Sequence, residues 1–231
     1  MWSIGLFSPS FCQHGVWAAD GPDDVRAFIS SLPENASCTV HRVLADGDMV
    51  ATHASYSNLS TAPQVGFELW RLEDGLIVEH WDSYEPLVAG TASGNSQVDG
   101  PTEPGAADGM ATKALVEEIV QTILVENDFS RLHEFLAGED LHPTQPALWQ
   151  RDPRTGHRPG GTGRAGHQQA VHNAPSRGRR RRLRAHPSEG LFGGERYTFY
   201  DLFRVANGRA VEHWDVMTPE PKELRHQNGL Y

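Results

Sequence analysis

The sequence predicts an α+β protein with two tandem domains, each built from helices packed on an antiparallel sheet. The main observation is a long-period repeat. Residues 67–86 read FELWRLEDGLIVEHWDSYEP, and residues 200–219 read YDLFRVANGRAVEHWDVMTP. The run EHWD at 79–82 recurs at 212–215, an offset of 133 positions between residues 79 and 212. A period this long indicates a duplicated domain and not a solenoid of short units.

The second observation is turn chemistry between alternating apolar runs. Asp74-Gly75 and Asn207-Gly208 are strong two-residue hairpin signals, one in each copy. An earlier hairpin is predicted in the first copy, with strands at 38–44 and 49–56 around the turn at 45–48. The first copy is therefore expected to place four antiparallel strands after a helix.

Helical patterns are the third observation. Residues 20–32 have acids early and apolar residues on one side, which predicts the helix of the first copy. Residues 112–126 have one apolar helical face, and Asp128 is a predicted N-cap for a helix that ends near Leu136. Residues 88–110, rich in Gly, Ala, Ser and Pro, are the expected linker between domains at 1–87 and 111–231. The first copy has no counterpart of the two helices that open the second, so we expect it to be truncated at its N-terminus, or its helices to come from elsewhere.

Charge is unevenly distributed. The chain has 20 Lys and Arg against 30 Asp and Glu, a net charge of −10. Between positions 142 and 186 there are ten arginines and one acid, which leaves a net charge of −19 on the rest. The acidic remainder argues against nucleic-acid binding, whereas the arginine-rich stretch alone argues for it.

Other features limit the class of protein. Cys12 and Cys38 have no CxxC spacing, which argues against a disulfide framework or a structural zinc site. Residues 1–10 have no basic region and no long apolar core, so neither a signal peptide nor a membrane span is expected. We therefore expect a cytoplasmic protein that binds no metal and no membrane.

Several motifs together resemble the SnoaL-like polyketide cyclase family of the nuclear transport factor 2-like superfamily, and within it the SnoaL-like aldol-condensation subgroup. The resemblance covers about residues 11–100, 111–141 and 188–231. The matching pieces are Gln13-His14, Ala19-Asp20-Gly21, Val40-His41-Arg42-Val43, Asp46-Gly47-Asp48, Tyr200-Asp201-Leu202-Phe203-Arg204, both EHWD runs and Gln227-Asn228-Gly229.

The resemblance implies cone-shaped domains with a curved antiparallel sheet around a pocket, and acid–base catalysis without a cofactor on a small carbonyl compound. It also implies dimerisation through the convex sheet face. We expect a pseudo-dimer of the two copies within one chain, or a homodimer.

The arginine-rich stretch falls outside the resemblance. Family members carry Tyr-Ile-Gln-His-Asn-Pro where residues 141–146 read LHPTQP. One permitted coding of those six residues, CTA CAT CCA ACA CAA CCC, read one base later gives Tyr-Ile-Gln-His-Asn. We therefore interpret residues 141–187 as a frameshifted, disordered insert that disrupts the middle of the second domain. Under this interpretation the arginines have no selected function, and we expect no nucleic-acid partner. A nucleic-acid or membrane patch and a solvated loop are the alternatives.

Candidate catalytic residues come from the repeated run, because residues i and i+2 of a strand share a face. His80 and Asp82 project together, as do His213 and Asp215. A carboxylate whose pKa is raised by apolar surroundings would remove a proton beside a carbonyl, and the imidazole would orient it or stabilise the enolate. The alternative interpretation is structural: the histidines bond a neighbouring loop, and the carboxylates cap a strand end.

Five further residues are candidates for substrate binding. His14 lies in the matched Gln-His pair, His41 lies on a hairpin strand, and Asp201 corresponds to Glu68 of the first copy. Trp81 and Trp214 are either substrate platforms or core packing. The competing functions are a SnoaL-like cyclase, isomerase or aldol-type lyase, a non-catalytic binding or dimerisation module of the same fold, and a damaged, inactive product.

Overall fold

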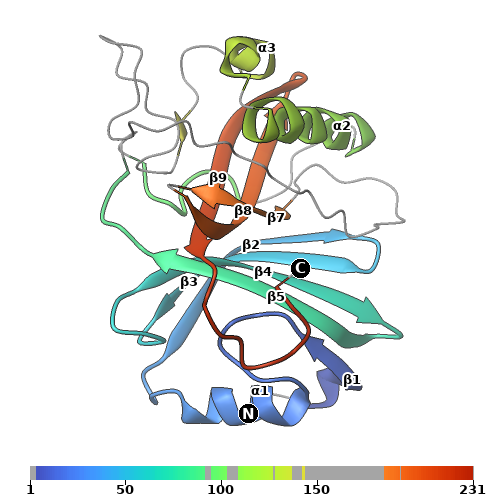
Figure 1. Ribbon diagram of the computed structural model, residues 1–231, viewed down its shortest axis with the longest axis vertical. Helices are drawn as coiled ribbons and strands as arrows, with labels where there is room; N and C mark the ends of the chain where they lie inside the picture. The colour runs from blue at the N-terminus through green and yellow to red at the C-terminus, as the bar shows by residue number, and fades with distance from the viewer. Residues whose placement is uncertain are drawn as a thin grey trace.

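The computed structural model describes residues 4–91, 95–102, 109–126, 128–136, 142–143, 185–192 and 194–230. Within them the chain forms two antiparallel meanders, each with a parallel strand added at one edge (Figure 1). The strand orders are β1-β5-β4-β3-β2 and β6-β9-β8-β7. The predicted α+β class, with a curved sheet and few helices, is confirmed.

The first sheet holds the hairpins expected from the sequence. Its elements are β1 (Phe7–Gln13), α1 (Pro22–Ser31), β2 (Ser37–Asp46), β3 (Met49–Ser57), β4 (Gln64–Glu73) and β5 (Leu76–Pro86), after a short 3-10 turn at Ile4–Leu6. The sequence did not predict β1, which pairs parallel with β5. Its run FSPSFCQ contains a proline, and no hairpin turn joins it to its partner β5, so the local signals used for the other strands did not mark it.

The second sheet follows the helices predicted after the linker. Its elements are α2 (Gly109–Ile119) continued by a π-helical turn (Val120–Val125), a 3-10 turn (Phe129–Arg131), α3 (Leu132–Phe135), β6 (His142–Pro143), β7 (Ala185–Phe192), β8 (Glu195–Ala206) and β9 (Arg209–Pro219). The predicted N-cap is confirmed, since the Asp128 carboxylate accepts a hydrogen bond from the Ser130 N–H at 3.2 Å. Most of the predicted insert at 141–187 lies outside the described residues, and its two ends contribute to β6 and β7.

Both predicted two-residue turns have the left-handed backbone that a tight hairpin requires. The φ angles are 48° and 79° at Asp74 and Gly75, and 51° and 71° at Asn207 and Gly208. The registers beyond the turns also agree. Glu68 faces Asp82 as Asp201 faces Asp215, and the register shifts after Arg71 and after Arg204. The repeated sequence therefore folds into two hairpins of the same register.

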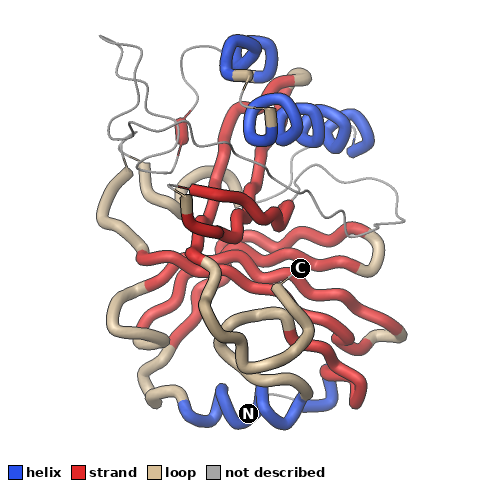
Figure 2. Tube along the Cα trace, in the orientation of Figure 1, coloured by secondary structure: helices blue, strands red, loops and turns tan. Residues whose placement is uncertain are grey.

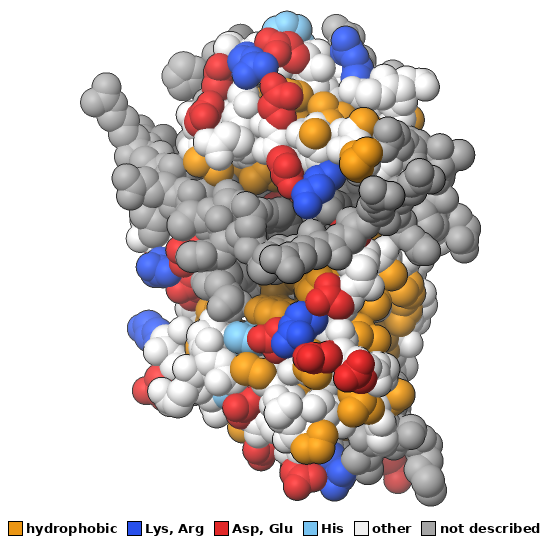
Figure 3. Space-filling view, turned by 90° about the vertical axis from the view of Figure 1, so that its right-hand side faces the viewer, with side chains coloured by type: hydrophobic (Ala, Val, Ile, Leu, Met, Phe, Trp, Pro, Cys, Tyr) orange, Lys and Arg blue, Asp and Glu red, His pale blue; other side chains and the backbone are white. Residues whose placement is uncertain are grey.

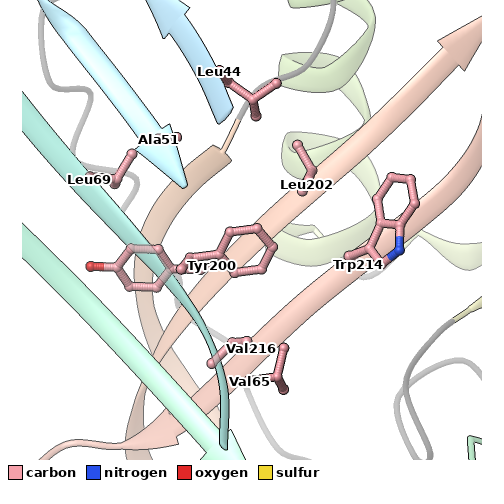
Figure 4. Close-up of a cluster of buried hydrophobic side chains, with 9 residues drawn as sticks. Leu44, Ala51, Val65, Leu69, Tyr200, Leu202, Trp214 and Val216 are labelled. Carbon is pink, nitrogen blue, oxygen red and sulfur yellow. The ribbon is translucent and has the colours of Figure 1, made fainter. Parts of the chain in front are cut away.

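The largest core lies between the two sheets. Leu44, Ala51, Val65, Phe67 and Leu69 of the first sheet meet Tyr200, Leu202, Trp214 and Val216 of the second (Figure 4). A second core packs α2 and its π-helical turn on β8 and β9 through Val116, Ile119, Val120, Ile123, Phe203, Val205 and Ala210. Each sheet therefore uses one face for the other sheet, and the second sheet covers its opposite face with α2.

The described part of the linker is fixed in this intersheet layer by Arg42. Its buried guanidinium donates to the carbonyls of Val98, Asp99 and Pro101, and it lies 4.1 Å from the ring centroid of Trp214. The Trp214 indole N–H also donates to the Asp99 carbonyl, at 2.9 Å. The predicted linker thus forms part of the contact between the two sheets.

The chain after β9 returns to the first sheet. Figure 1 shows it descending from β9 to the loop after β1, where it bonds Gly15 and Gln13, and Figure 2 shows that this segment is a loop. On the face shown in Figure 3, several acidic and basic side chains lie close to one another. Cys12 and Cys38 are free thiols. No helix among the described residues is long and apolar enough to cross a lipid bilayer.

Candidate functional site

A cluster of acidic and phenolic groups lies on the face of the first sheet that points away from the second. Residues of β4 and β5 alternate between the two faces, so Val65, Phe67 and Leu69 enter the intersheet core. Glu68 and Asp82 are cross-strand partners on the opposite face. Tyr84, two residues beyond Asp82, and Tyr56 of β3 join them through hydrogen bonds.

Glu68 is the acceptor at the centre of this cluster. Its Oε1 accepts hydrogen bonds from the hydroxyls of Tyr56 at 2.7 Å and Tyr84 at 2.9 Å, and the Thr52 hydroxyl lies 3.4 Å from its Oε2. Burial raises the pKa of Glu68, while these three donors act in the opposite direction. Two tyrosine hydroxyls are therefore held on one buried carboxyl group.

Asp82 lies beside this network. Its Oδ1 accepts from the Val16 N–H at 3.2 Å, and its Oδ2 lies 3.4 Å from the Tyr84 hydroxyl. Only 6% of the residue is exposed. Burial, and next the charge of Glu68, raise the pKa of Asp82 to about 7. This carboxyl group therefore exchanges its proton near neutral pH, as a general base or acid must.

The loop that follows β1 covers Asp82. A side chain at Gly15 would place its Cβ 2.3 Å from the Asp82 Oδ2, so the loop can lie this close only with glycine. The C-terminal segment holds this loop in place. The His226 ring nitrogen Nε2 bonds the Gly15 carbonyl at 2.9 Å, and the Asn228 side chain donates to the Gln13 carbonyl at 2.9 Å.

His80 lies next to the cluster, but its side chain hydrogen-bonds Gln13, at the start of the loop that covers Asp82. Its Nδ1 donates to the Gln13 side-chain oxygen at 2.8 Å, and its ring stacks on Trp70 at 3.8 Å. Burial, and next the charge of His14, lower the pKa of His80 to about 3, so the ring is neutral. Among the described residues, its Nε2 and the indole nitrogen of Trp17 are buried without a hydrogen-bond partner. Trp17 packs edge-on against Tyr84 at 6.1 Å.

The corresponding residues of the second sheet have different hydrogen-bond partners. The His213 Nε2 lies 2.9 Å from the Asp201 Oδ1, whereas His80 bonds Gln13 in the first sheet. Burial, and next the charge of Asp201, raise the pKa of Asp215 well above its usual value. Position 217, which corresponds to Tyr84, is Met217. The second sheet thus keeps both predicted catalytic residues, and at the position of Tyr84 it has a thioether in place of a phenol.

The other predicted substrate-binding residues lie away from Asp82. Trp214 is buried between the sheets, and Trp81 packs partly against the same core. His14 stacks on Trp81, with 4.8 Å between ring centroids. The His41 Nε2 bonds the Ser55 hydroxyl at 2.8 Å. Among the predicted residues, the structure therefore brings His80 and Asp82 to one face, and it brings Asp201, His213 and Asp215 together.

Sequence reasoning missed three side chains of this candidate site. Tyr56 and Tyr84 lie on the same face as Asp82, and the spacing of Tyr84 at two residues beyond Asp82 was a usable signal. Trp17 comes from the loop that covers the sheet, and no strand periodicity could place it.

Within the part of the chain that the structure describes, two groups of side chains have donor atoms close enough together to share a metal ion. In each group the donor atoms all lie within 4.8 Å of one another. One is Asp201, His213 and Asp215, all buried. The other is Cys12, His14 and Glu79 at the edge between β1 and β5.

Comparison with known proteins matches residues 4–80 to the family described as SnoaL-like domain. The resemblance to that family is therefore confirmed over the region that contains β1 to β4 and His80. No curated protein matches the chain.

Solved structures give distant likenesses. IdmH from Streptomyces antibioticus, described as a candidate polyketide cyclase, has 20% identity, covers 35% of this chain and 76% of its own, and has a TM-score of 0.30. An NTF-2 like protein of unknown function from Burkholderia xenovorans has 14% identity, covers 38% and 72%, and scores 0.33. AclR from Streptomyces galilaeus, described as a candidate hydroxylase, has 20% identity, covers 36% and 73%, and scores 0.29. At these scores the likenesses support no statement about activity.

Proposed function

We propose that the first sheet carries a SnoaL-like acid–base site that removes a proton beside the carbonyl group of a small compound. The observation that supports this most is Asp82, a buried carboxyl group whose pKa is raised to about 7. A base with a pKa near the working pH combines a useful ionised fraction with strong proton affinity. The match of residues 4–80 to the SnoaL-like domain agrees with this proposal.

The chemistry follows from the groups around Asp82. The ionised carboxylate takes a proton from the carbon next to the carbonyl, and the electron pair of that C–H bond moves to give an enolate. The Trp17 N–H, which has no partner among the described residues, is available to donate to the enolate oxygen. In an aldol cyclisation the enolate carbon then bonds a second carbonyl carbon of the same molecule, and the new alkoxide takes the proton back from Asp82. In an isomerisation the proton returns to a different carbon.

Tyr56 and Tyr84 hold the Glu68 carboxyl group in place next to Asp82, the proposed base. Their hydrogen bonds fix Glu68, and its charge contributes to the raised pKa of Asp82. We propose Tyr56, Tyr84 and Glu68 as positioning residues. His80 positions the loop after β1 through its hydrogen bond to Gln13.

We propose further that the chain is a tandem duplication whose two sheets form a pseudo-dimer. The equal hairpin registers and the shared intersheet core support this. A catalytic role for His213 and Asp215 stays a prediction of the sequence, and we propose that it is smaller than that of Asp82, because Met217 stands in the position of Tyr84.

The frameshift interpretation of residues 141–187 is also a proposal. It aligns Pro143 with Gln13, and β6 pairs Pro143 with His213 just as β1 pairs Gln13 with His80. Sequencing the gene across codons 140–188 tests it. A translation of the alternative frame with no likeness to residues 13–50 would sink the idea.

A non-catalytic ligand-binding module is the competing function, because the same buried groups can bind a carbonyl compound without turning it over. Hydrogen–deuterium exchange at the carbon next to a ketone, followed by NMR in D₂O over a panel of small diketones and keto esters, separates the two. We expect exchange with the natural chain and a loss of about 10²–10⁴-fold in Asp82→Asn. Binding without proton exchange would contradict the enzyme and support the non-catalytic binding module.

A further inference from the structure

We infer that Cys12, His14 and Glu79 form a zinc-binding site at the edge between β1 and β5, separate from the acid–base cluster and independent of the proposed function. Sequence reasoning argued against zinc because the cysteines have no CxxC spacing. The three ligands instead come from two strands that the fold pairs in parallel, with Cys12 opposite Glu79.

Strand geometry places the three donors on one face. Cys12 and His14 are two residues apart, so both point to the side of the sheet opposite Gln13. The Cys12 Sγ lies 3.5 Å from the His14 Nε2, and the Glu79 Oε1 lies 3.7 Å from the same nitrogen. With tetrahedral zinc bonds to sulfur and nitrogen, the two donor atoms would lie about 3.5 Å apart. The sulfur and nitrogen therefore already stand at the separation that a shared zinc ion requires.

The His14 ring is held in the tautomer that a metal needs. Its Nδ1 lies 3.1 Å from the Gly229 carbonyl oxygen, which can only accept, so Nδ1 carries the proton. In the neutral ring the lone pair is then on Nε2, which faces Cys12 and Glu79. A carbonyl on the far nitrogen is a usual support of metal-binding histidines. The His14 ring is also stacked on Trp81, with 4.8 Å between the ring centroids.

The third donor is also oriented. Arg71 binds the Glu79 Oε2 and leaves Oε1 directed toward His14. Thiolate, imidazole and carboxylate are the donors that zinc accepts, and three protein ligands leave a fourth position for water. His14 is 8% exposed and the Glu79 side chain 25%, so an ion can enter from solvent.

The alternative is a plain hydrogen bond from the Cys12 thiol to the His14 Nε2. Titration of the full chain with Co²⁺ distinguishes the two, because cobalt bound to a thiolate gives a charge-transfer absorption band in the near ultraviolet. We expect this band at one equivalent of Co²⁺, and we expect Zn²⁺ to displace it.

Variants assign the band to its ligands. Cys12→Ser should abolish it, while Cys38→Ser, the matched control at the other free thiol, should keep it. Asp201→Asn should also keep it, which separates this site from the carboxylates of the second sheet. His14→Gln and Glu79→Gln should weaken cobalt binding at least about tenfold. No band in the natural chain, or a band that survives Cys12→Ser, would overturn the inference, whatever the outcome for Asp82.

Discussion

The two sheets start from almost the same hairpin and arrive at different polar networks. In the first sheet His80 bonds the Gln13 side chain, and Glu68 is bound by Tyr56 and Tyr84. In the second sheet His213 bonds Asp201, the residue in the position of Glu68. Hairpin register therefore sets which residues are neighbours, and residues outside the hairpin decide which of them pair.

Side-chain length and the residues added around the hairpin explain the difference. Glu68 reaches past the strand to the tyrosines on either side, whereas the shorter Asp201 stays within reach of the imidazole on the neighbouring strand. Gln13, added by β1, gives His80 an acceptor in another strand. If the proposed function is right, the first sheet should contribute more to proton exchange than the second.

The largest test of this comparison replaces the corresponding carboxyl groups one at a time. Asp82→Asn should reduce carbonyl-adjacent proton exchange about 10²–10⁴-fold, because an amide cannot act as the base. Asp215→Asn should leave the rate within about threefold. Rates from NMR exchange, with folding checked by circular dichroism, measure both. Equal losses in the two variants would contradict a division of labour between the sheets.

The corresponding tryptophans should differ in their effect on stability. Trp214 is 1% exposed and contacts both the linker and Arg42, whereas Trp81 is only partly buried. Trp214→Ala should lower the free energy of unfolding by about 3–5 kcal/mol, and Trp81→Ala by roughly half of that or less. Urea unfolding monitored by circular dichroism gives both values. Trp214→Phe serves as a milder variant if the alanine variant does not fold.

The pH dependence of stability tests the raised carboxyl pKa in the first sheet. Burial first, and then the charge of Glu68, raise the pKa of Asp82 from its usual 3.8 to about 7, so the folded state holds a proton that the unfolded state releases. The contribution of Asp82 is therefore fully present below pH 3.8 and is lost as the pH rises to about 7.

Asp82→Asn should remove this loss. Relative to the natural chain, the variant should gain up to about 1.4 kcal/mol per pH unit between these two values. Denaturant unfolding at several pH values measures the difference. Parallel curves for the two proteins would mean that the pKa of Asp82 is not raised.

The smallest expected effect is the loss of one Arg–Glu ion pair in each sheet, and it should be equal in the two sheets. Arg71 pairs with Glu79 and Arg204 with Glu212 across the same register positions, with 32% and 33% of the arginine side chains exposed. Solvent screens such pairs, so each should be worth at most about 1 kcal/mol and weaken with salt. Double-mutant cycles to alanine in metal-free buffer measure both. A difference larger than the experimental error would show that the hairpins are not energetically equivalent.

Prediction from sequence succeeded where the signal was local. Asp74-Gly75 and Asn207-Gly208 fixed the turns, and Asp128 fixed a helix start. Placing Asp82 and His80 on one face required only strand alternation. β1 and its parallel pairing were missed because its run contains a proline and its partner lies more than 60 residues away in the chain.

The sequence by itself determined that the EHWD run occurs twice, each time after a tight hairpin, with a histidine and a carboxylate sharing a face. Turn chemistry and strand alternation are local, and they act in the same way wherever the hairpin lies. Only the tertiary structure decided that Asp82 lies under Gly15 beside Tyr84, and that Cys12 and His14 meet Glu79. Those contacts depend on the loop after β1 and on the returning C-terminal segment. The energy that holds those segments comes from packing and hydrogen bonds between residues far apart in the chain.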